Sequence, residues 1–161
     1  MSLSNTDHAE FMRQAIRLAT ENVTSGKGGP FGCVIVRDGE VIAACANTVT
    51  ATNDPTAHAE VNTIRAACAA LGTFQLTGCD VYTSCEPCPM CLAAIYWARC
   101  RSIYFGNTAQ DAAEAGFDDS FLYTEIQRPI SERSIPTQTL LSDEATESFN
   151  TWRETTQRID Y

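Results

Sequence analysis

Two short segments of the 161-residue chain carry side chains that could do chemistry together. The first is His58-Ala59-Glu60, and the second is Pro87-Cys88-Pro89-Met90-Cys91. One imidazole and two thiols are ligands that zinc prefers, and three protein ligands leave the fourth tetrahedral position free for water, as in catalytic zinc sites. The pattern therefore indicates one catalytic Zn²⁺ per subunit, held by His58, Cys88 and Cys91.

Glu60 is the candidate proton carrier beside that ion. Two thiolates and a neutral imidazole cancel the formal charge of zinc, so its bound water should be less acidic than water on a three-histidine site. A separate base is then needed. Glu60 lies two residues from the ligand His58 and is placed to take the water proton and to deliver protons to a substrate.

Helix starts must position both segments. Pro89 is typical of a first helical position, so Cys88 at the cap and Cys91 one turn later share one side of a helix that we expect to continue to Ala98. The free N–H groups and the positive dipole end at such a helix start favour the thiolates that bind metal.

A second helix is expected to begin near Pro55, after an Asn53-Asp54 turn, and to end near Gly72. His58 and Glu60 can then both face the metal only if the site lies beyond the helix end.

The remaining pattern predicts one domain over residues 1–161. Asp38-Gly39 is a strong hairpin signal, and a strand–helix–strand order around the cysteine pair indicates parallel pairing. We expect a three-layer α/β/α fold, with a mixed central sheet of about five strands and helices on both faces. The further predicted helices cover residues 7–24, 120–126 and 143–158, and the predicted strands cover 31–37, 40–47, 80–84, 102–105 and 137–141.

Composition excludes several classes of protein. Eleven Lys and Arg against twenty Asp and Glu give a net charge of −9, which speaks against a nucleic-acid partner. The sequence contains no apolar run of membrane-spanning length and no secretory signal, so we expect a cytoplasmic protein without a membrane partner. Eight cysteines then indicate metal ligands plus buried apolar residues, the latter being Cys33, Cys45, Cys68, Cys79 and Cys100.

Other interpretations of the cysteine pair stay open. A lone Cys-x-x-Cys is also typical of half a structural zinc site or of a redox pair. A closed structural site needs a fourth ligand, for which Cys85 is a candidate, because the only other histidine, His8, lies in the expected first helix. The upstream His-Ala-Glu favours catalysis, and the presence of Glu60 speaks against a non-catalytic zinc module that binds partners.

These motifs resemble the zinc nucleobase and nucleoside deaminases, whose signature is His-x-Glu followed by Pro-Cys-x-x-Cys. The resemblance extends over nearly the entire chain and is closest to bacterial guanine deaminases of the cytidine-deaminase-like family. The segments that carry it are residues 28–32, 53–60, 84–91 and 112–119. The resemblance implies attack of zinc-bound hydroxide on guanine, with Glu60 as proton shuttle and with xanthine and ammonia as products.

The resemblance also implies a set of substrate contacts and a homodimer. Asn47 and Asp119 would hydrogen-bond the purine edge, and Phe31, Trp97 and the Ala59 backbone would complete the pocket. Residues 143–161 would cross to a partner subunit, where the terminal Tyr161 would close the pocket. A tRNA adenosine deaminase and a cytosine or cytidine deaminase remain alternatives, since the metal site leaves the choice of ring to the pocket walls.

Overall fold

The computed structural model describes residues 5–161, in two units that meet at Asp119 and Ser120 and are described one after the other. The first unit is built on a four-stranded sheet in the order β2-β1-β3-β4. Its strands are β1 (Gly32–Arg37), β2 (Glu40–Ala46), β3 (Cys79–Cys85) and β4 (Ser102–Asn107). β1 is antiparallel to both of its neighbours, whereas β3 and β4 are parallel, as their connection predicts.

The β1–β2 hairpin confirms the turn signal in the sequence. Asp38 and Gly39 both have positive φ, 52° and 86°, as a two-residue type I′ turn requires. Beyond the turn the register shifts once, between Ile35 and Val36, and then pairs Gly32 with Ala46 at the far end. This register brings the end of β2 beside the start of β1.

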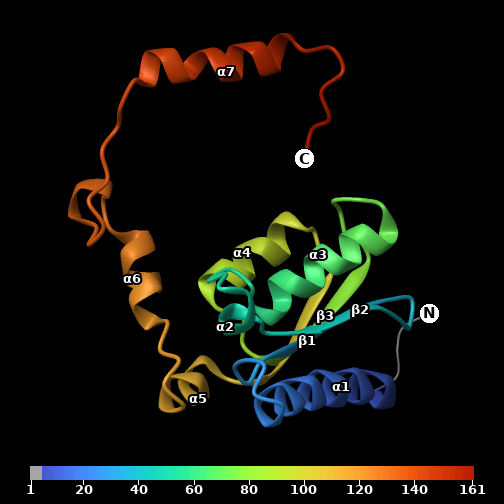
Figure 1. The fold of residues 1–161 in the computed structure, drawn as a ribbon. Helices are drawn as coiled ribbons and strands as arrows, with labels where there is room; N and C mark the ends of the chain where they lie inside the picture. Colours follow the sequence, from blue (N-terminus) through green and yellow to red (C-terminus); the bar gives the residue numbers. More distant parts are fainter. Residues whose placement is uncertain (1–4) are drawn as a thin grey trace. The chain divides into compact units, whose positions relative to one another are not determined.

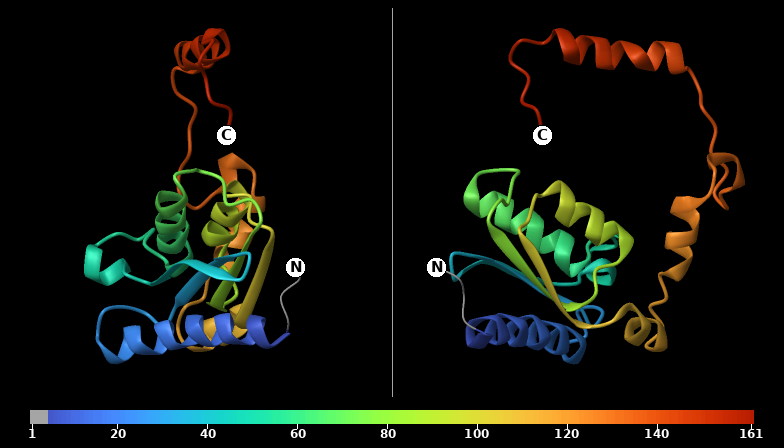
Figure 2. Two further views of the ribbon diagram at one scale, coloured as in Figure 1. Left: turned by 90° about the vertical axis from the view of Figure 1, so that its right-hand side faces the viewer. Right: turned by 180° about the vertical axis from the view of Figure 1, so that it is seen from behind.

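Helices cover both faces of the sheet, which confirms the predicted three-layer α/β/α fold. Helix α1 (Asn5–Thr24) covers one face, and α3 (Ala59–Leu71) and α4 (Pro89–Trp97) cover the other (Figures 1 and 2). Gly32 marks how closely α1 crosses β1, because a Cβ at this position would lie 2.3 Å from the carbonyl oxygen of Ala15.

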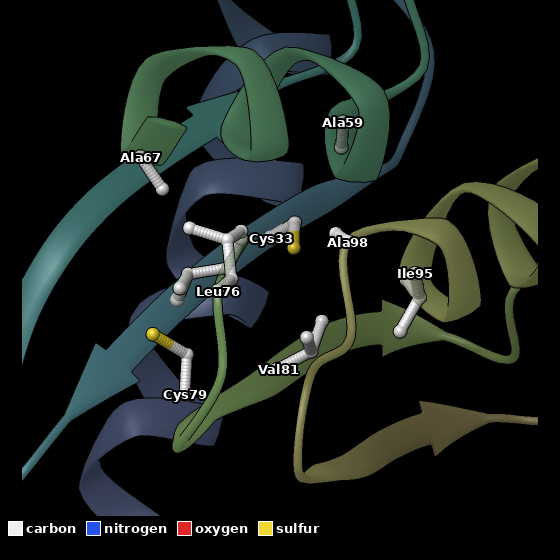
Figure 3. Packing of buried hydrophobic residues seen from close by; sticks show 9 residues of the cluster. Cys33, Ala59, Ala67, Leu76, Cys79, Val81, Ile95 and Ala98 are labelled. Atoms are coloured by element: carbon white, nitrogen blue, oxygen red, sulfur yellow. The ribbon is translucent and has the colours of Figure 1, made fainter. Parts of the chain in front are cut away.

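The side chains of each strand alternate between these two layers. Val34, Val36 and Tyr82 pack beneath α1, whereas Cys33, Ile35 and Val81 belong to the larger core under α3 and α4. Figure 3 shows Cys33 and Val81 within this core. Of the five cysteines predicted to be core residues, Cys33 and Cys79 are buried. The other three are half-buried, namely Cys45, Cys68 and Cys100.

The structure departs from the sequence predictions in four elements. Helix α3 begins at Ala59 and not near Pro55, because Asp54 accepts hydrogen bonds from the Thr56 backbone and hydroxyl and holds the preceding residues in a turn. Two short helices, α2 (Val49–Thr52) and α5 (Ala109–Glu114), were not predicted. The predicted fifth strand over residues 137–141 is wrong: this segment pairs with no described strand, so the sheet has four strands.

The second unit consists of α6 (Ser120–Gln127), a 3₁₀ turn (Ile130–Glu132) and α7 (Ser142–Glu154). Both α-helices were predicted, although α7 ends four residues earlier than expected. No residue of this unit is buried, and several large apolar side chains are exposed, among them Leu140, Phe149 and Tyr161. None of the helices described in the chain has the length and apolar character needed to cross a membrane.

Candidate metal centre and cavity

Two helix N-termini bring the three predicted metal ligands together. His58 is the N-cap residue of α3, and Cys88 is the N-cap residue of α4, with Pro89 as its first helical residue. Cys88 has the extended backbone that a following proline imposes, and Cys91 lies in the first turn of α4. The ligand atoms of His58, Cys88 and Cys91 all lie within 4.8 Å of one another, as the spacing predicts.

The distances between these atoms fit a tetrahedral zinc ion. His58 Nδ1 lies 3.6 Å from Cys88 Sγ and 3.5 Å from Cys91 Sγ. Zinc–nitrogen and zinc–sulfur bonds at tetrahedral angles separate such atoms by about 3.5 Å. Cys85 lies outside this group, with its Sγ 3.6 Å from the Thr108 carbonyl oxygen. The donor set therefore suits zinc with three protein ligands.

Hydrogen bonds prepare the ligand group for a cation. The pKa of the Cys88 thiol is lowered to about 4, because Cys91 and then His58 donate hydrogen bonds to its sulfur. The same contact raises the pKa of His58. The pKa of Cys91 is raised far above its ordinary value, because its thiol donates to Cys88 and is buried beside Glu60. A bound cation would replace the proton that Cys91 holds.

Glu60 lies in the first turn of α3 and is only 5% exposed. The hydroxyl of Thr83 donates to its Oε1 over 3.2 Å, and the sulfur of Cys91 lies 3.4 Å from its Oε2. Burial raises the pKa of the Glu60 carboxyl. A carboxyl group with a raised pKa beside a metal site is suited to carry protons near neutral pH.

The sequence reasoning missed Thr83. Along β3, Val81, Thr83 and Cys85 point to the face covered by α3 and α4, so Thr83 is a polar residue at a core-facing position. That alternation is the signal that could have identified it.

The metal centre opens into a cavity of about 550 Å³, within the range of about 300–1,000 Å³ that small-molecule sites occupy. Six of the predicted site residues line it, namely Phe31, Asn47, His58, Glu60, Cys88 and Asp119. The segment 117–119, after α5, supplies a wall that includes Phe117. Its ring meets Phe31 edge-on, with ring centroids 4.9 Å apart.

Polar groups in the cavity differ in how they are held. Asn47 is 7% exposed, and its Oδ1 accepts a hydrogen bond from Val49 N–H. The pKa of Asp119 is raised, first by partial burial and then by the negative charge of Cys88. Glu86, another lining residue that was not predicted, accepts a hydrogen bond from Ala109 N–H and so fastens the start of α5 beside the metal loop.

Four predicted site residues are not among those that line this cavity, and one of them is the predicted metal ligand Cys91, which is fully buried in the first turn of α4. Ala59 is fully buried at the start of α3, and Trp97 is 65% exposed at the end of α4. Tyr161 belongs to the second unit, which the structure describes separately.

Comparison with known proteins agrees with this geometry. The zinc-binding region of the cytidine and deoxycytidylate deaminases matches residues 5–107. The chain belongs to this deaminase family. The matched region contains the three metal ligands and Glu60, whereas the segment 117–119 of the cavity wall lies beyond it.

Individual deaminases match to different extents. Guanine deaminase of Bacillus subtilis (strain 168) is 53% identical over 155 residues, which cover 96% of this chain and 99% of that protein. An X-ray structure of guanine deaminase from Bacillus subtilis superimposes with a TM-score of 0.93 over 96% of this chain and 98% of that one. A tRNA-specific adenosine deaminase of Agrobacterium fabrum (strain C58) is 52% identical over 91 residues, covering 54% of this chain and 59% of that protein.

Proposed function

We propose that this protein hydrolyses guanine to xanthine and ammonia. The observation that carries the proposal is the group of His58, Cys88 and Cys91 beside the buried carboxyl of Glu60, at a cavity of small-molecule size. The likeness to a guanine deaminase over 96% of the chain supports guanine as the ring that is hydrolysed.

The residues of the chain divide the work of the reaction. A zinc ion held by His58, Cys88 and Cys91 supplies a Lewis acid that makes water a nucleophile near neutral pH. Glu60 takes a proton from the attacking water and passes it to the ring nitrogen beside the aminated carbon C2. The new C2–O bond forms. Glu60 then takes the remaining proton of the new hydroxyl group and delivers it to the exocyclic nitrogen, so the bond from C2 to that nitrogen breaks and ammonia leaves. Thr83 keeps the carboxyl oriented through these transfers.

We propose that Asn47 and Asp119 hydrogen-bond the purine edge and that Phe31 packs against the ring. All three line the cavity. The amide of Asn47 can donate hydrogen bonds there, and the carboxylate of Asp119 can accept them. The Ala59 backbone and Trp97 stay candidates for further contacts. The role of Tyr161 depends on the assembly.

For the assembly we propose a homodimer in which residues 143–161 cross to the partner and Tyr161 closes its pocket. No residue of the segment 120–161 is buried, and its large apolar side chains, such as Leu140 and Phe149, are exposed. This supports the proposal, because exposed apolar side chains of this kind are typical of a surface that binds another protein chain. Sedimentation should give a dimer, and a chain that ends before Ser142 should lose guanine turnover. Undiminished activity of that truncated chain would contradict the lid.

The proposed function is tested by ammonia release from guanine, adenine, cytosine, cytidine and aminated triazines. Wild-type protein should release ammonia fastest from guanine, and Glu60→Ala should be at least about 100-fold slower. Equal activity of this variant would refute the proton shuttle, and inactivity of the zinc-loaded wild type on every ring would favour a non-catalytic zinc module.

A tRNA adenosine deaminase is the second candidate, favoured by the 52% identity to the Agrobacterium protein. The net charge of −9 opposes binding of a tRNA stem. Inosine formation in a tRNA anticodon stem-loop, with no turnover of free guanine, would establish this candidate instead.

We also propose a cytoplasmic location for the protein, which cell fractionation tests.

A further inference from the structure

The segment that carries Asn47 into the cavity is held by two asparagine side chains from opposite faces of the sheet. Asn22, near the end of α1, donates both hydrogens of its amide, one to Asn47 O over 2.8 Å and one to Gly29 O over 2.9 Å. Asn62, on α3, donates to Ala46 O over 3.0 Å and to Thr48 Oγ1 over 3.1 Å. The residues on both sides of Asn47, and Asn47 itself, are therefore fixed by side-chain amides.

The contact at Asn22 leaves no room for adjustment. Asn22 is 6% exposed, and a Cβ added to Gly28 would lie 2.4 Å from Asn47 O and 2.8 Å from Asn22 Nδ2. Gly28 therefore packs directly against Asn47 and Asn22, with no space for a side chain between them. Asn22 does not itself line the cavity, so it can act on a substrate only through the residues that it holds.

The amide of Asn47 is oriented as well as placed. Its backbone N–H donates to Phe31 O over 3.0 Å, and its Oδ1 accepts from Val49 N–H over 3.2 Å. This second bond turns the side-chain oxygen toward the chain, so the NH₂ group is the end that suits an acceptor atom on a bound ring. Both bonds depend on a fixed backbone at residues 46–48.

We propose that Asn22 and Asn62 are positioning residues for substrate recognition: they hold residues 46–48 so that Asn47 presents its NH₂ group to the ring in one orientation. The inference rests on the proposed function, because it takes Asn47 to be a substrate contact. Preorganisation of a recognition group by its supporting residues is what makes such a contact effective.

The two residues differ in a way that an experiment can use. Asn62 also donates to Ala57 O over 3.2 Å, and Ala57 directly precedes the metal ligand His58. The Asn22 amide donates to Asn47 O and Gly29 O, neither of which belongs to the metal-binding segments. Replacing Asn22 should therefore affect recognition alone, whereas replacing Asn62 should weaken both recognition and zinc retention.

The decisive experiment is a double-mutant cycle between Asn22 and Asn47, in which kcat and KM for guanine and zinc content are measured. Asn22→Ala should raise KM and lower kcat/KM by about 10-fold or more, with zinc content unchanged. In the Asn47→Ala background the same change should cost less than about 2-fold, since the group that it positions is gone. Asn62→Ala should lower kcat/KM similarly and speed zinc loss to a chelator.

Tyr82→Phe is the matched control, because it removes another hydrogen bond between α1 and the sheet, the partly buried 2.6 Å bond to His8, and Tyr82 does not line the cavity. It should lower thermal stability and leave KM unchanged. If Asn22→Ala does not fold, Asn22→Ser, which keeps one donor, is measured in the same cycle.

Three results would overturn the proposal and separate it from the proposed function. If the loss caused by Asn22→Ala is the same with and without Asn47, its role is structural. If Asn47→Ala turns over guanine like the wild type, the inference fails while the proposed function stands. A zinc-loaded wild type that does not deaminate guanine refutes both.

Discussion

Glu60→Gln provides the sharpest test of how the site works. The amide has the shape of the carboxyl, so Thr83 can still donate to Oε1 over the 3.2 Å seen for the carboxylate. What is lost is the capacity to hold a proton. Because Glu60 is only 5% exposed, bulk water cannot readily take over this task. A positioned acid–base group contributes about 10²- to 10⁴-fold in rate, or about 3–5 kcal/mol of the barrier.

The assay is ammonia release from guanine at saturating substrate, together with zinc content and the thermal unfolding midpoint. We expect kcat to fall by about 10²- to 10⁴-fold while zinc stays at one ion per chain, since Glu60 is outside the ligand group. The unfolding midpoint should not fall, because burial already disfavours the charged carboxylate.

Glu10→Gln is the control, an exposed carboxylate on α1 that pairs with Arg13 and Arg17, and it should keep wild-type turnover. A Glu60→Gln variant with more than about a tenth of wild-type kcat would refute the proton shuttle. Loss of zinc from this variant would instead indicate that Glu60 is a metal ligand.

Three further predictions concern the metal, the packing and the half-buried thiol of Cys100. Removal of zinc by a chelator should abolish ammonia release, and added Zn²⁺ should restore it; activity that survives in metal-free protein would contradict this. Gly32→Ala should lower the free energy of unfolding in urea by about 2 kcal/mol or more, because the new Cβ would lie 2.3 Å from Ala15 O and 2.8 Å from Ala19 N; an unchanged midpoint would rule out this packing. Burial raises the pKa of the Cys100 thiol from 9.0 to about 12, so its contribution to stability is complete below pH 9 and is lost as the pH rises toward 12. The unfolding midpoint should fall over this range, and should fall less in Cys100→Ala.

The metal centre was predictable because its signals are local. Pro89 sets the start of α4, and this start places Cys88 and Cys91 one turn apart. The hairpin at Asp38-Gly39 and the strand–helix–strand order also depend on residues close together in the sequence. The fold class followed from the same short-range patterns.

The cavity wall was less predictable because it depends on contacts between distant residues. Asn22 and Asn47 are 25 positions apart, and Thr83 lies 23 positions from Glu60. Neither Asn22 nor Thr83 forms a motif with its sequence neighbours, so only the folded chain shows what each one holds. The acidic segment after Gly106 likewise gave no helix signal, although a Thr108–Asp111 capping box starts α5 there.

The wrong strand over residues 137–141 has a related cause. Its two β-branched residues, Thr137 and Thr139, favour an extended backbone, but a strand forms only where another strand completes its backbone hydrogen bonds. The sequence shows the propensity of this segment and not the partner that it needs.

The residues that we propose for the chemistry and those that we propose for substrate contact lie on different elements of the fold. The ligands and Glu60 lie on the N-termini of α3 and α4 and are supported by β3, whereas Asn47, Phe31 and Asp119 lie on segments that α1 and α5 hold. Only the first set is needed to activate water. We therefore expect a change in the second set to alter which ring is accepted without removing the metal. The match to the zinc-binding region of the family ends at residue 107, so it includes Phe31 and Asn47 and leaves out Asp119, which belongs to the cavity segment 117–119.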